Sequence, residues 1–316
     1  MNSLLQFVRK WMLPLAIVLG IGLYLLYHFT PALHLWGRWL HPLVSEGQRL
    51  VIALLMFFQF VRISPHDLRF SRWHLGALAV QVLSFLALAA LVLCTEGDLR
   101  MLLECAMLCL ICPTASAAGV ITDRLGGSLA ATVTYLALIN VAATFLIPLV
   151  IPVVNPSATL GFWAYVGHIA WKVFPVLILP GLLAWLIRYT THRLQRRLVR
   201  WSPHSFYIWG VGLTLAMVLA TRALLLSGLG AGVIAGIVLV ALACCAVQFY
   251  AGRKMGKGRV ASITAGQTLG QKNTGFLIWL GYNYLTPVTS VAGGLYAVFQ
   301  NLFNSWELYQ REKGRL

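Results

Sequence analysis

Long stretches without any charged residue constrain the fold of this chain more than any other feature of its sequence. Charge-free segments cover residues 11–37, 73–95, 125–171, 201–221, 223–252 and 273–306. A membrane-spanning helix needs about 20 predominantly apolar residues, and lipid tolerates only helices and closed barrels as spanning elements. Barrel strands alternate apolar with polar residues, which these segments do not. The sequence therefore predicts an all-α polytopic membrane protein.

The composition excludes several other classes of protein. The 316 residues are 59% hydrophobic and 10% charged, whereas a soluble domain has roughly 45–50% apolar and about 25% charged residues. This shortage of charge excludes a soluble enzyme, a disordered protein and a nucleic-acid-binding protein. The six cysteines lie in or beside apolar segments, without the spacing of a disulfide framework or a zinc site. We therefore expect them to be packing residues, and we expect no metal centre.

The charge-free segments divide into ten helices when they are split at Pro, Gly and Asn. The predicted spans lie near residues 11–28, 46–62, 73–94, 101–123, 128–152, 160–187, 204–222, 229–250, 259–282 and 286–308. This arrangement puts 18 Lys and Arg residues on one side of the membrane and three, Arg38, Arg100 and Arg222, on the other. Basic residues gather in cytoplasmic loops. We interpret the net charge of +16 in this way. Both termini are predicted to be cytoplasmic, in a multi-pass protein of the plasma (inner) membrane.

The ten predicted helices form two halves of similar length, residues 11–152 and residues 160–308. Each half has five spans. Because five is odd, two such repeats in one chain must have opposite orientations in the membrane. Inverted repeats of this kind are a common architecture of secondary transporters. The sequence thus predicts one integral membrane unit built from two inverted five-helix repeats.

The fourth helix of each half is interrupted by residues that break helices. The first contains Pro113 within the small-residue segment 112–119, and the second contains several Gly and Thr residues within 262–275. Backbone groups freed by such breaks are tolerated at membrane depth only where protein or water satisfies them. Close packing of small residues explains 115–119 but not the polar group at 267–273. Paired breaks in matching positions of two halves are a sequence indicator of a transport site.

Lys272 is the most unusual residue of these two segments. A lysine near the middle of a bilayer costs roughly 2.5–3.5 kcal/mol on insertion scales, so it is expected to have a partner or to face water. Its positive charge and the N-termini of the two half-helices favour an anionic ligand. The residues predicted to form the binding site are Thr114, Ser116, Gly119, Thr132, Asn140, Thr268, Gln271, Lys272, Asn273 and Asn301.

Several short motifs, in order along the chain, resemble the bile acid:sodium symporter family. They are Leu78-Ala-Val-Gln81, Cys112-Pro113, Gly126-Gly-Ser-Leu-Ala130, Gly270-Gln-Lys-Asn-Thr-Gly275 and Ala297-Val-Phe-Gln-Asn-Leu302. The resemblance covers roughly residues 46–308. It implies ten helices arranged as a panel and a core, with broken fourth and ninth helices that cross in the core.

The chain departs from this family at the positions that bind sodium in sodium-coupled members. Ala118-Gly119 replace a Ser-Asn pair, Leu136 replaces a hydroxyl residue, and Thr268 and Lys272 replace an acidic residue and a Gln. Gln81 and Thr132 keep the family pattern. An ammonium group about 4 Å from a sodium ion repels it by roughly 4 kcal/mol at an effective dielectric constant of about 20. We therefore expect no sodium at these positions and no other cofactor.

Two roles for Lys272 follow from this substitution. Its ammonium group could stand in the place of a sodium ion, held by Gln81 and backbone carbonyls, or it could carry a coupling proton. Proton coupling, uniport and exchange all stay open. Among the other charges, Asp123 is expected to pair with Arg124, Glu104 to line the outer vestibule or to snorkel, and Lys172 to snorkel or to face the substrate.

The sequence as a whole predicts a secondary transporter of a small organic anion that works by alternating access. The alternative is a membrane sensor or receptor that keeps a transporter fold without transport. An intramembrane enzyme would need a nucleophile–base or carboxylate–histidine set at membrane depth, and no such set is visible, so we predict no enzyme activity. The expected partners are the anion and the lipid bilayer, without nucleic acid. Substrate identity, direction of transport and oligomeric state stay open.

Overall fold

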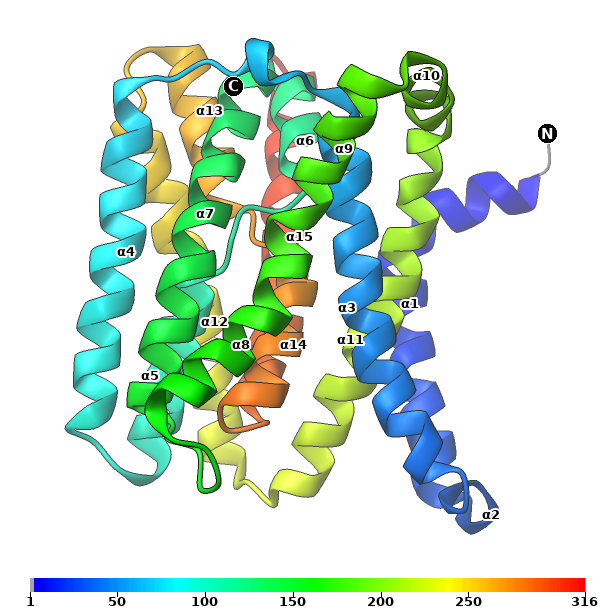
Figure 1. Ribbon diagram of the computed structural model, residues 1–316, viewed down its shortest axis with the longest axis vertical. Coiled ribbons are helices and arrows are strands. Elements are labelled where there is room, and N and C mark those ends of the chain that lie inside the picture. The colour runs from blue at the N-terminus through cyan, green and yellow to red at the C-terminus, as the bar shows by residue number, and fades with distance from the viewer. Residues whose placement is uncertain (1–2, 316) are drawn as a thin grey trace.

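The computed structural model describes residues 3–315, without the side chains of residues 3–10 and Arg38. The side chains of Arg9, Lys10 and Arg38, which enter the charge count above, therefore lie outside the described part. Within residues 3–315 the chain is helical and forms no β-strand (Figure 1). The elements are α1 (Ser3–Phe29), α2 (Pro31–His34), α3 (Gly37–Arg62), η1 (Pro65–Asp67), α4 (Arg72–Leu93), α5 (Gly97–Ile111), α6 (Ala118–Arg124), α7 (Leu129–Val154), α8 (Phe162–Leu177), α9 (Leu179–Thr190), α10 (His192–Trp201), η2 (Ser202–His204), α11 (Ser205–Ser227), α12 (Ala231–Met255), α13 (Arg259–Gly270), α14 (Thr274–Tyr284) and α15 (Thr289–Glu312).

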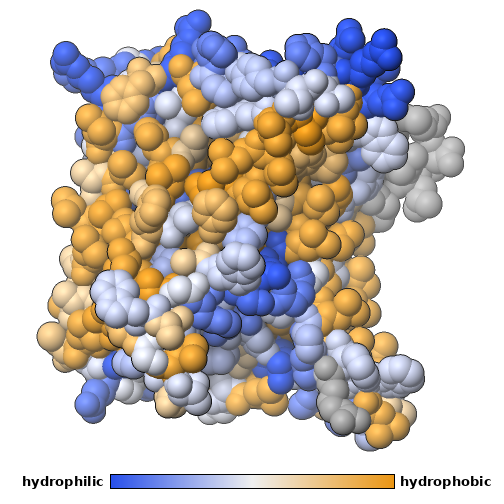
Figure 2. Space-filling view, viewed as in Figure 1, coloured by the Kyte–Doolittle hydropathy of each residue, from blue (hydrophilic) through white to orange (hydrophobic). Residues whose placement is uncertain are grey.

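Six segments are long and apolar enough to cross a membrane: Trp11–Phe29, Trp39–Arg62, Arg72–Leu93, Leu129–Val154, His192–Ser227 and Ala231–Met255. Helices α8 and α9 are bent by 42° relative to each other and make a seventh candidate when they are taken as one span. Large apolar side chains, such as Leu83, Phe145 and Leu239, point outward from these helices. Figure 2 shows them as a broad hydrophobic band with hydrophilic residues along the upper edge. The prediction of a helical, multi-pass membrane protein is confirmed at this level.

Three of the ten predicted spans are not long, apolar helices. The predicted spans 101–123 and 259–282 are each divided into two short helices, α5 with α6 and α13 with α14. Helix α15 is continuous but more polar, with Gln300, Asn301 and Asn304 along its length. These three regions contain most of the polar residues singled out in the sequence, while Gln81 lies on α4 and Thr132 and Asn140 lie on α7.

Both described ends of the chain lie in the upper part of Figure 1, together with η1, α10 and the turn between α12 and α13. The turns on either side of α2, between α4 and α5 and between α11 and α12 lie at the opposite end. The segments 62–72, 188–203, 251–259 and 309–315, which contain most of the Lys and Arg residues, thus share the upper end. Their clustering agrees with the charge asymmetry expected from the sequence.

The helices pack as two groups. Helix α11 packs against both α1 and α3 on one side, and α9 packs on α3. Helices α4, α5, α7, α12, α13 and α15 form the other group, in which the most extensive contact joins α12 and α13. Helix α14 contacts members of both groups. The two broken helices therefore lie within the second group and reach toward the first.

Two glycines allow α12 and α13 to approach each other closely. A Cβ atom on Gly252 would overlap the carbonyl group of Ala265, and a Cβ atom on Gly256 would overlap that of Ala261. Since backbone atoms cannot move aside as a flexible side chain does, only glycine fits at these positions. This contact fixes the position of α13, which ends at the candidate site.

Candidate functional site

The backbones of the two broken helices pair with each other where they cross. Helix α5 ends at Ile111 and α6 begins at Ala118, while α13 ends at Gly270 and α14 begins at Thr274. Thr114 and Lys272 form an isolated antiparallel bridge. The N–H of Ala115 donates to the carbonyl of Gln271 at 3.0 Å, and the N–H of Asn273 donates to the carbonyl of Pro113 at 2.8 Å. Each break thus satisfies backbone groups that the other leaves free, as buried polar groups require.

Side chains of neighbouring helices hold this crossing in place. The hydroxyl of Thr114 donates to the carbonyl of Thr268 at 2.8 Å. The hydroxyl of Thr268 donates to that of Thr132 on α7 at 3.1 Å. On the other side, the backbone N–H of Lys272 donates to Oε1 of Gln300 on α15 at 2.8 Å. All five side chains are buried. The crossing is therefore fixed by hydrogen bonds to both α7 and α15.

Two matching Gln–Tyr pairs satisfy carbonyl groups at the ends of α5 and α13. Near α5, Nε2 of Gln81 donates to the carbonyl of Cys112 at 2.9 Å, and the hydroxyl of Tyr135 donates to Oε1 of Gln81 at 2.7 Å. Near α13, the hydroxyl of Tyr296 donates to the carbonyl of Gly270 at 2.8 Å, and Nε2 of Gln248 donates to that hydroxyl at 3.0 Å. A helix end leaves carbonyls without partners, and these side chains supply the donors.

Gln248, Tyr135 and Tyr296 were not among the residues predicted from the sequence. The signal that would have found them is their position, because each Gln lies in the third predicted span of its half and each Tyr in the fifth. Comparing the two halves helix by helix, instead of by sequence identity, would have brought the two pairs together.

Replacing Tyr296 with Phe is expected to lower the free energy of unfolding by about 1–3 kcal/mol, because the carbonyl of Gly270 loses its side-chain donor while it stays buried. Thermal denaturation of the purified protein measures this loss. Tyr282→Phe is the matched control, because this tyrosine is only partly buried at the end of α14, and its hydroxyl accepts from Nη1 of Arg222 instead of donating to a buried carbonyl. Equal stability of Tyr296→Phe and the wild type would contradict the assigned role.

Lys272 is the largest charged side chain that the structure buries completely. Its exposed fraction is 0%, and within the described residues its Nζ atom has no hydrogen-bond partner. No carboxylate pairs with Lys272 in the ion pairs of residues 3–315. The thiols of Cys112, Cys109, Cys244 and Cys245 lie close enough to interact with the amine electrostatically.

The expected bonds from Nζ to Gln81 and to backbone carbonyls are not formed in this structure. Gln81 is buried near the crossing, as expected, but its Nε2 donates to the carbonyl of Cys112 and its Oε1 accepts from the hydroxyl of Tyr135. The sequence placed Gln81 correctly beside the break. It did not show that Tyr135 would donate to Oε1, the atom of this amide that accepts hydrogen bonds.

The other predicted site residues divide into those at the crossing and those away from it. Gln271 lies at the crossing, and the side chain of Asn273 caps α14 by accepting from the N–H of Phe276 at 3.2 Å. Ser116 is half-buried in the first break. Gly119 instead packs in α6, where a Cβ atom would overlap Leu129.

Asn140 and Asn301 make their bonds elsewhere. Nδ2 of Asn140 donates to the carbonyl of Leu177 on α8 at 3.3 Å, while its buried Oδ1 has no partner within the described chain. Nδ2 of Asn301 donates to the carbonyl of Ala297 in its own helix at 2.7 Å. Asn140 thus lies where α7 meets α8, and the bond of Asn301 within its own helix does not link it to the crossing.

A polar residue on α3 faces the start of α14. Nε2 of Gln48 lies 2.8 Å from the position that a Cβ atom on Gly275 would occupy, and Oδ1 of Asn273 is 3.7 Å from the same point. Gln48 is buried, and its Oε1 has no hydrogen-bond partner among the described residues. A ligand at the start of α14 would therefore also meet α3, a helix of the first group.

The remaining charged residues have structural partners. Nε of Arg100 donates to Oε1 of Glu104 at 3.2 Å, and the N–H of Thr286 donates to Oε2 at 3.3 Å. Glu104 is thus buried as a link between α5 and the turn before α15. Lys172 pairs with Glu46 of α3 at 3.2 Å, so it is not a second buried, unpaired cation. Hydrophilic surface interrupts the apolar band over α3 and α8 (Figure 2).

The expected pair between Asp123 and Arg124 is absent from the ion pairs of residues 3–315. Adjacent residues of a helix point in different directions, which explains why the two side chains do not meet. The carbonyl of Asp123 instead accepts from the N–H of Gly126 at 2.9 Å, in the turn between α6 and α7.

The crossing thus combines a rigid, hydrogen-bonded backbone with one buried amine that has no counter-charge. Within the described chain, no three His, Cys, Asp or Glu side chains are arranged to hold a metal ion. An amine in this setting is suited to bind an anion or to exchange a proton, while the half-helix α14 presents its N-terminus beside it. No protein-family model and no curated protein sequence matches this chain.

Proposed function

We propose that this protein is a secondary transporter that moves a small organic anion by alternating access, with its binding site at the crossing of α5–α6 and α13–α14. The observation that supports this most directly is the complete burial of Lys272, whose Nζ has no hydrogen bond and no ion pair within residues 3–315. An isolated buried charge is very costly, whereas a charge paired with an anion is not. The amine is therefore a site that an anion completes.

The location of this amine fits alternating access. The crossing belongs to the group of helices around α12, while Gln48 belongs to α3 in the other group. A ligand between Lys272, the start of α14 and Gln48 would contact both groups. Relative movement of the two groups would then open the site to one side of the membrane or to the other, which is how many secondary transporters work.

The proposal includes ten spans in two inverted repeats, residues 11–152 and 160–308. Helices α5 with α6 act as the fourth span, α13 with α14 as the ninth, and α15 as the tenth. The repeated Gln–Tyr pairs support this arrangement, because Gln81 and Tyr135 in the first half have the same task as Gln248 and Tyr296 in the second. Both termini are proposed to face the cytoplasm across the plasma (inner) membrane, as their shared end and its basic residues suggest.

The resemblance to bile acid:sodium symporters leads to a proposal about coupling. In this chain Lys272 replaces an oxygen ligand, and Thr268 uses its hydroxyl to bind Thr132. Neither position offers the negative charge that compensates a sodium ion for its lost water. The protein is therefore proposed to work without sodium, as a proton-coupled transporter, a uniporter or an exchanger.

Reconstitution into proteoliposomes tests both parts of the proposal. We expect uptake of at least one member of a panel of radiolabelled small carboxylates, at the same rate in sodium chloride and in choline chloride. A strict requirement for sodium would contradict the role of Lys272. Saturable binding of a carboxylate by the purified protein without any flux would favour the alternative, a sensor that keeps the transporter fold.

A further inference from the structure

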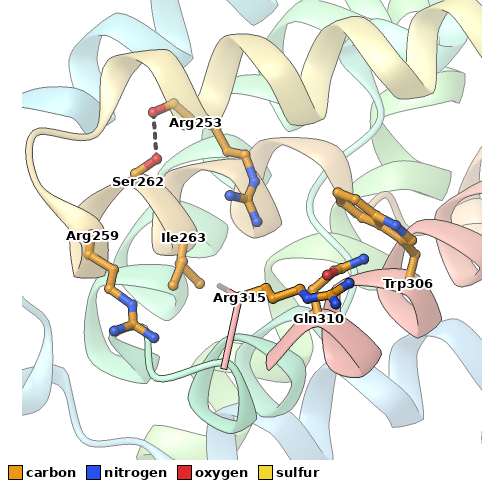
Figure 3. Close-up of a pocket in the computed structure, with 7 residues that line it drawn as sticks. All are labelled: Arg253, Arg259, Ser262, Ile263, Trp306, Gln310 and Arg315. Carbon is orange, nitrogen blue, oxygen red and sulfur yellow. Dashed lines mark hydrogen bonds between the residues drawn. The ribbon is translucent and has the colours of Figure 1, made fainter. Parts of the chain in front are cut away.

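A basic cavity opens at the end of the molecule that contains both described chain ends, away from the crossing. It has a volume of about 460 Å³ and is lined by Arg253, Arg259, Ser262, Ile263, Trp306, Gln310 and Arg315. Figure 3 shows the three arginines around one hollow, on the end of α12, the start of α13 and the chain after α15. None of the lining residues is acidic. Three arginines from separate elements therefore line a single space.

Orientation in the membrane does not by itself require such convergence. Basic residues set topology by their number in a loop, whatever direction their side chains take. Two lysines of the same region illustrate this, because Nζ of Lys254 lies over the ring of Tyr250 and Nζ of Lys313 lies over that of Tyr309. Neither lysine lines the cavity. The arginines, in contrast, surround a space large enough for a ligand.

The chemistry of the lining favours a phosphate group. Each guanidinium group is a planar fork of donors that matches the oxygens of phosphate or carboxylate. A carboxylate has only two oxygens, whereas a terminal phosphate group has three, so it is able to accept from forks on three sides. Helix α13 also starts at this cavity, and its N-cap residue, Gly258, provides no side-chain cap. The half-exposed ring of Trp306 offers an apolar surface for the rest of the ligand.

A buried chain of hydrogen bonds connects this cavity to the crossing. Nε and Nη2 of Arg253 donate to Oε1 of Glu307 at 3.0 and 2.6 Å. Glu307 is almost fully buried, and its Oε2 accepts from Nε2 of Gln267. Oε1 of Gln267 in turn accepts from Nε2 of Gln271, whose carbonyl pairs with Ala115 in the crossing. Any ligand that competes for Arg253 therefore acts on the segment next to Lys272.

We propose that this cavity, with Arg253, Arg259 and Arg315, binds a phosphate group and that the bound phosphate alters the crossing through Glu307, Gln267 and Gln271. The phosphate belongs either to a soluble phosphate ester or to the headgroup of a phosphomonoester lipid. Binding itself is independent of the transport function, whereas a regulatory effect on transport rests on the function proposed above.

The binding step is tested with the full-length protein in nanodiscs. Inorganic phosphate is titrated into nanodiscs of phosphatidylcholine, and in a second arm the thermal stability is compared in nanodiscs with and without phosphatidic acid. We compare the wild type with Arg259→Gln/Arg315→Gln and with the control Lys254→Gln/Lys313→Gln, which removes the same charge from residues outside the cavity. The arginine variant is expected to bind about tenfold more weakly or worse, and the lysine variant to bind as the wild type does.

The two arms separate the sources of the phosphate. Saturation by inorganic phosphate in phosphatidylcholine nanodiscs supports a soluble ester, and stabilisation by phosphatidic acid alone supports a lipid headgroup. Equal weakening of both double variants would overturn the proposal, because it would show attraction to the basic face as a whole. Absence of any effect of both probes on the wild type would overturn it as well.

The connection to the crossing has its own readout. Hydrogen exchange of the peptide that covers residues 266–272 is measured with and without the bound phosphate, in the wild type and in Gln267→Leu. We expect phosphate to change the exchange of this peptide in the wild type and to leave it unchanged in the variant. Phosphate that binds without changing exchange in the wild type would overturn the coupling through Gln267. A failure of transport leaves this measurement interpretable, because it needs no substrate.

Discussion

Replacing Lys272 with Met is expected to abolish the binding of small carboxylates while it stabilises the fold. Met has nearly the same length as Lys and fills the same space without the amine. The loss of the positive charge of Lys272 should weaken carboxylate binding by about a hundredfold, which corresponds to about 3 kcal/mol. Removal of a buried amine without hydrogen bonds should raise the free energy of unfolding by about 1–3 kcal/mol. Thermal denaturation with and without carboxylates measures both effects.

Lys172→Met is the matched control for this experiment. Lys172 is also a lysine within a helix of the apolar band, but it is partly exposed and pairs with Glu46. Its replacement should leave carboxylate binding at the crossing intact and should not stabilise the fold. Carboxylate binding by Lys272→Met at the wild-type level would remove the basis of the proposed function. A fold that is destabilised by Lys272→Met would show that the amine has a partner in the folded protein.

Replacing Gly252 with Ala is expected to destabilise the protein by about 3 kcal/mol or more. The added methyl group would overlap the carbonyl oxygen of Ala265 and would lie 2.8 Å from Cα of Gly266. Because these atoms belong to the backbone of α13, the two helices must separate to make room. Separation of α12 from α13 would also displace Gln271 and Lys272, so binding at the crossing should decrease in parallel.

Gly232→Ala on the same helix is the control for this second prediction. A Cβ atom on Gly232 would meet nothing within 4 Å. The substitution should therefore be neutral or stabilising by up to about 1 kcal/mol, as expected for Gly to Ala in a helix. Thermal denaturation of both variants, together with their elution in size-exclusion chromatography, measures the difference. Equal stability of the two variants would show that α12 and α13 are not in close contact.

The sequence predicted some features of the candidate site and not others. Both helix breaks and the depth of Lys272 were predicted from local composition, since Pro113 and the glycines around Gln271 weaken a helix at these points. The hydrogen-bond partners of the buried side chains could not be predicted from local composition. Gln81 was expected to bind Lys272, but it satisfies the carbonyl of Cys112 instead. The packing of α4 against α5 decides which carbonyl lies within reach of the Gln81 side chain, and the sequence does not show this packing.

The hydrogen-bond partners of Glu307 could not be predicted from the sequence either. From the sequence it is an acidic residue near the end of the chain, where solvent exposure is the usual outcome. The structure buries it because Arg253, 54 positions earlier in the chain, and Gln267 supply its hydrogen bonds. Only the packing of α12, α13 and α15 brings these three residues together.

The sequence by itself determined that the chain lies in an apolar, lipid environment and that it is helical. It also determined the positions of the two helix breaks and the presence of a lysine within one of them. These properties depend on residues close together in the chain and on the free energy of placing them in lipid. The tertiary structure decided which polar groups satisfy one another and that the amine of Lys272 is left with none. In a bilayer the partners of a buried polar group come from other helices, and their distances are fixed only when those helices pack.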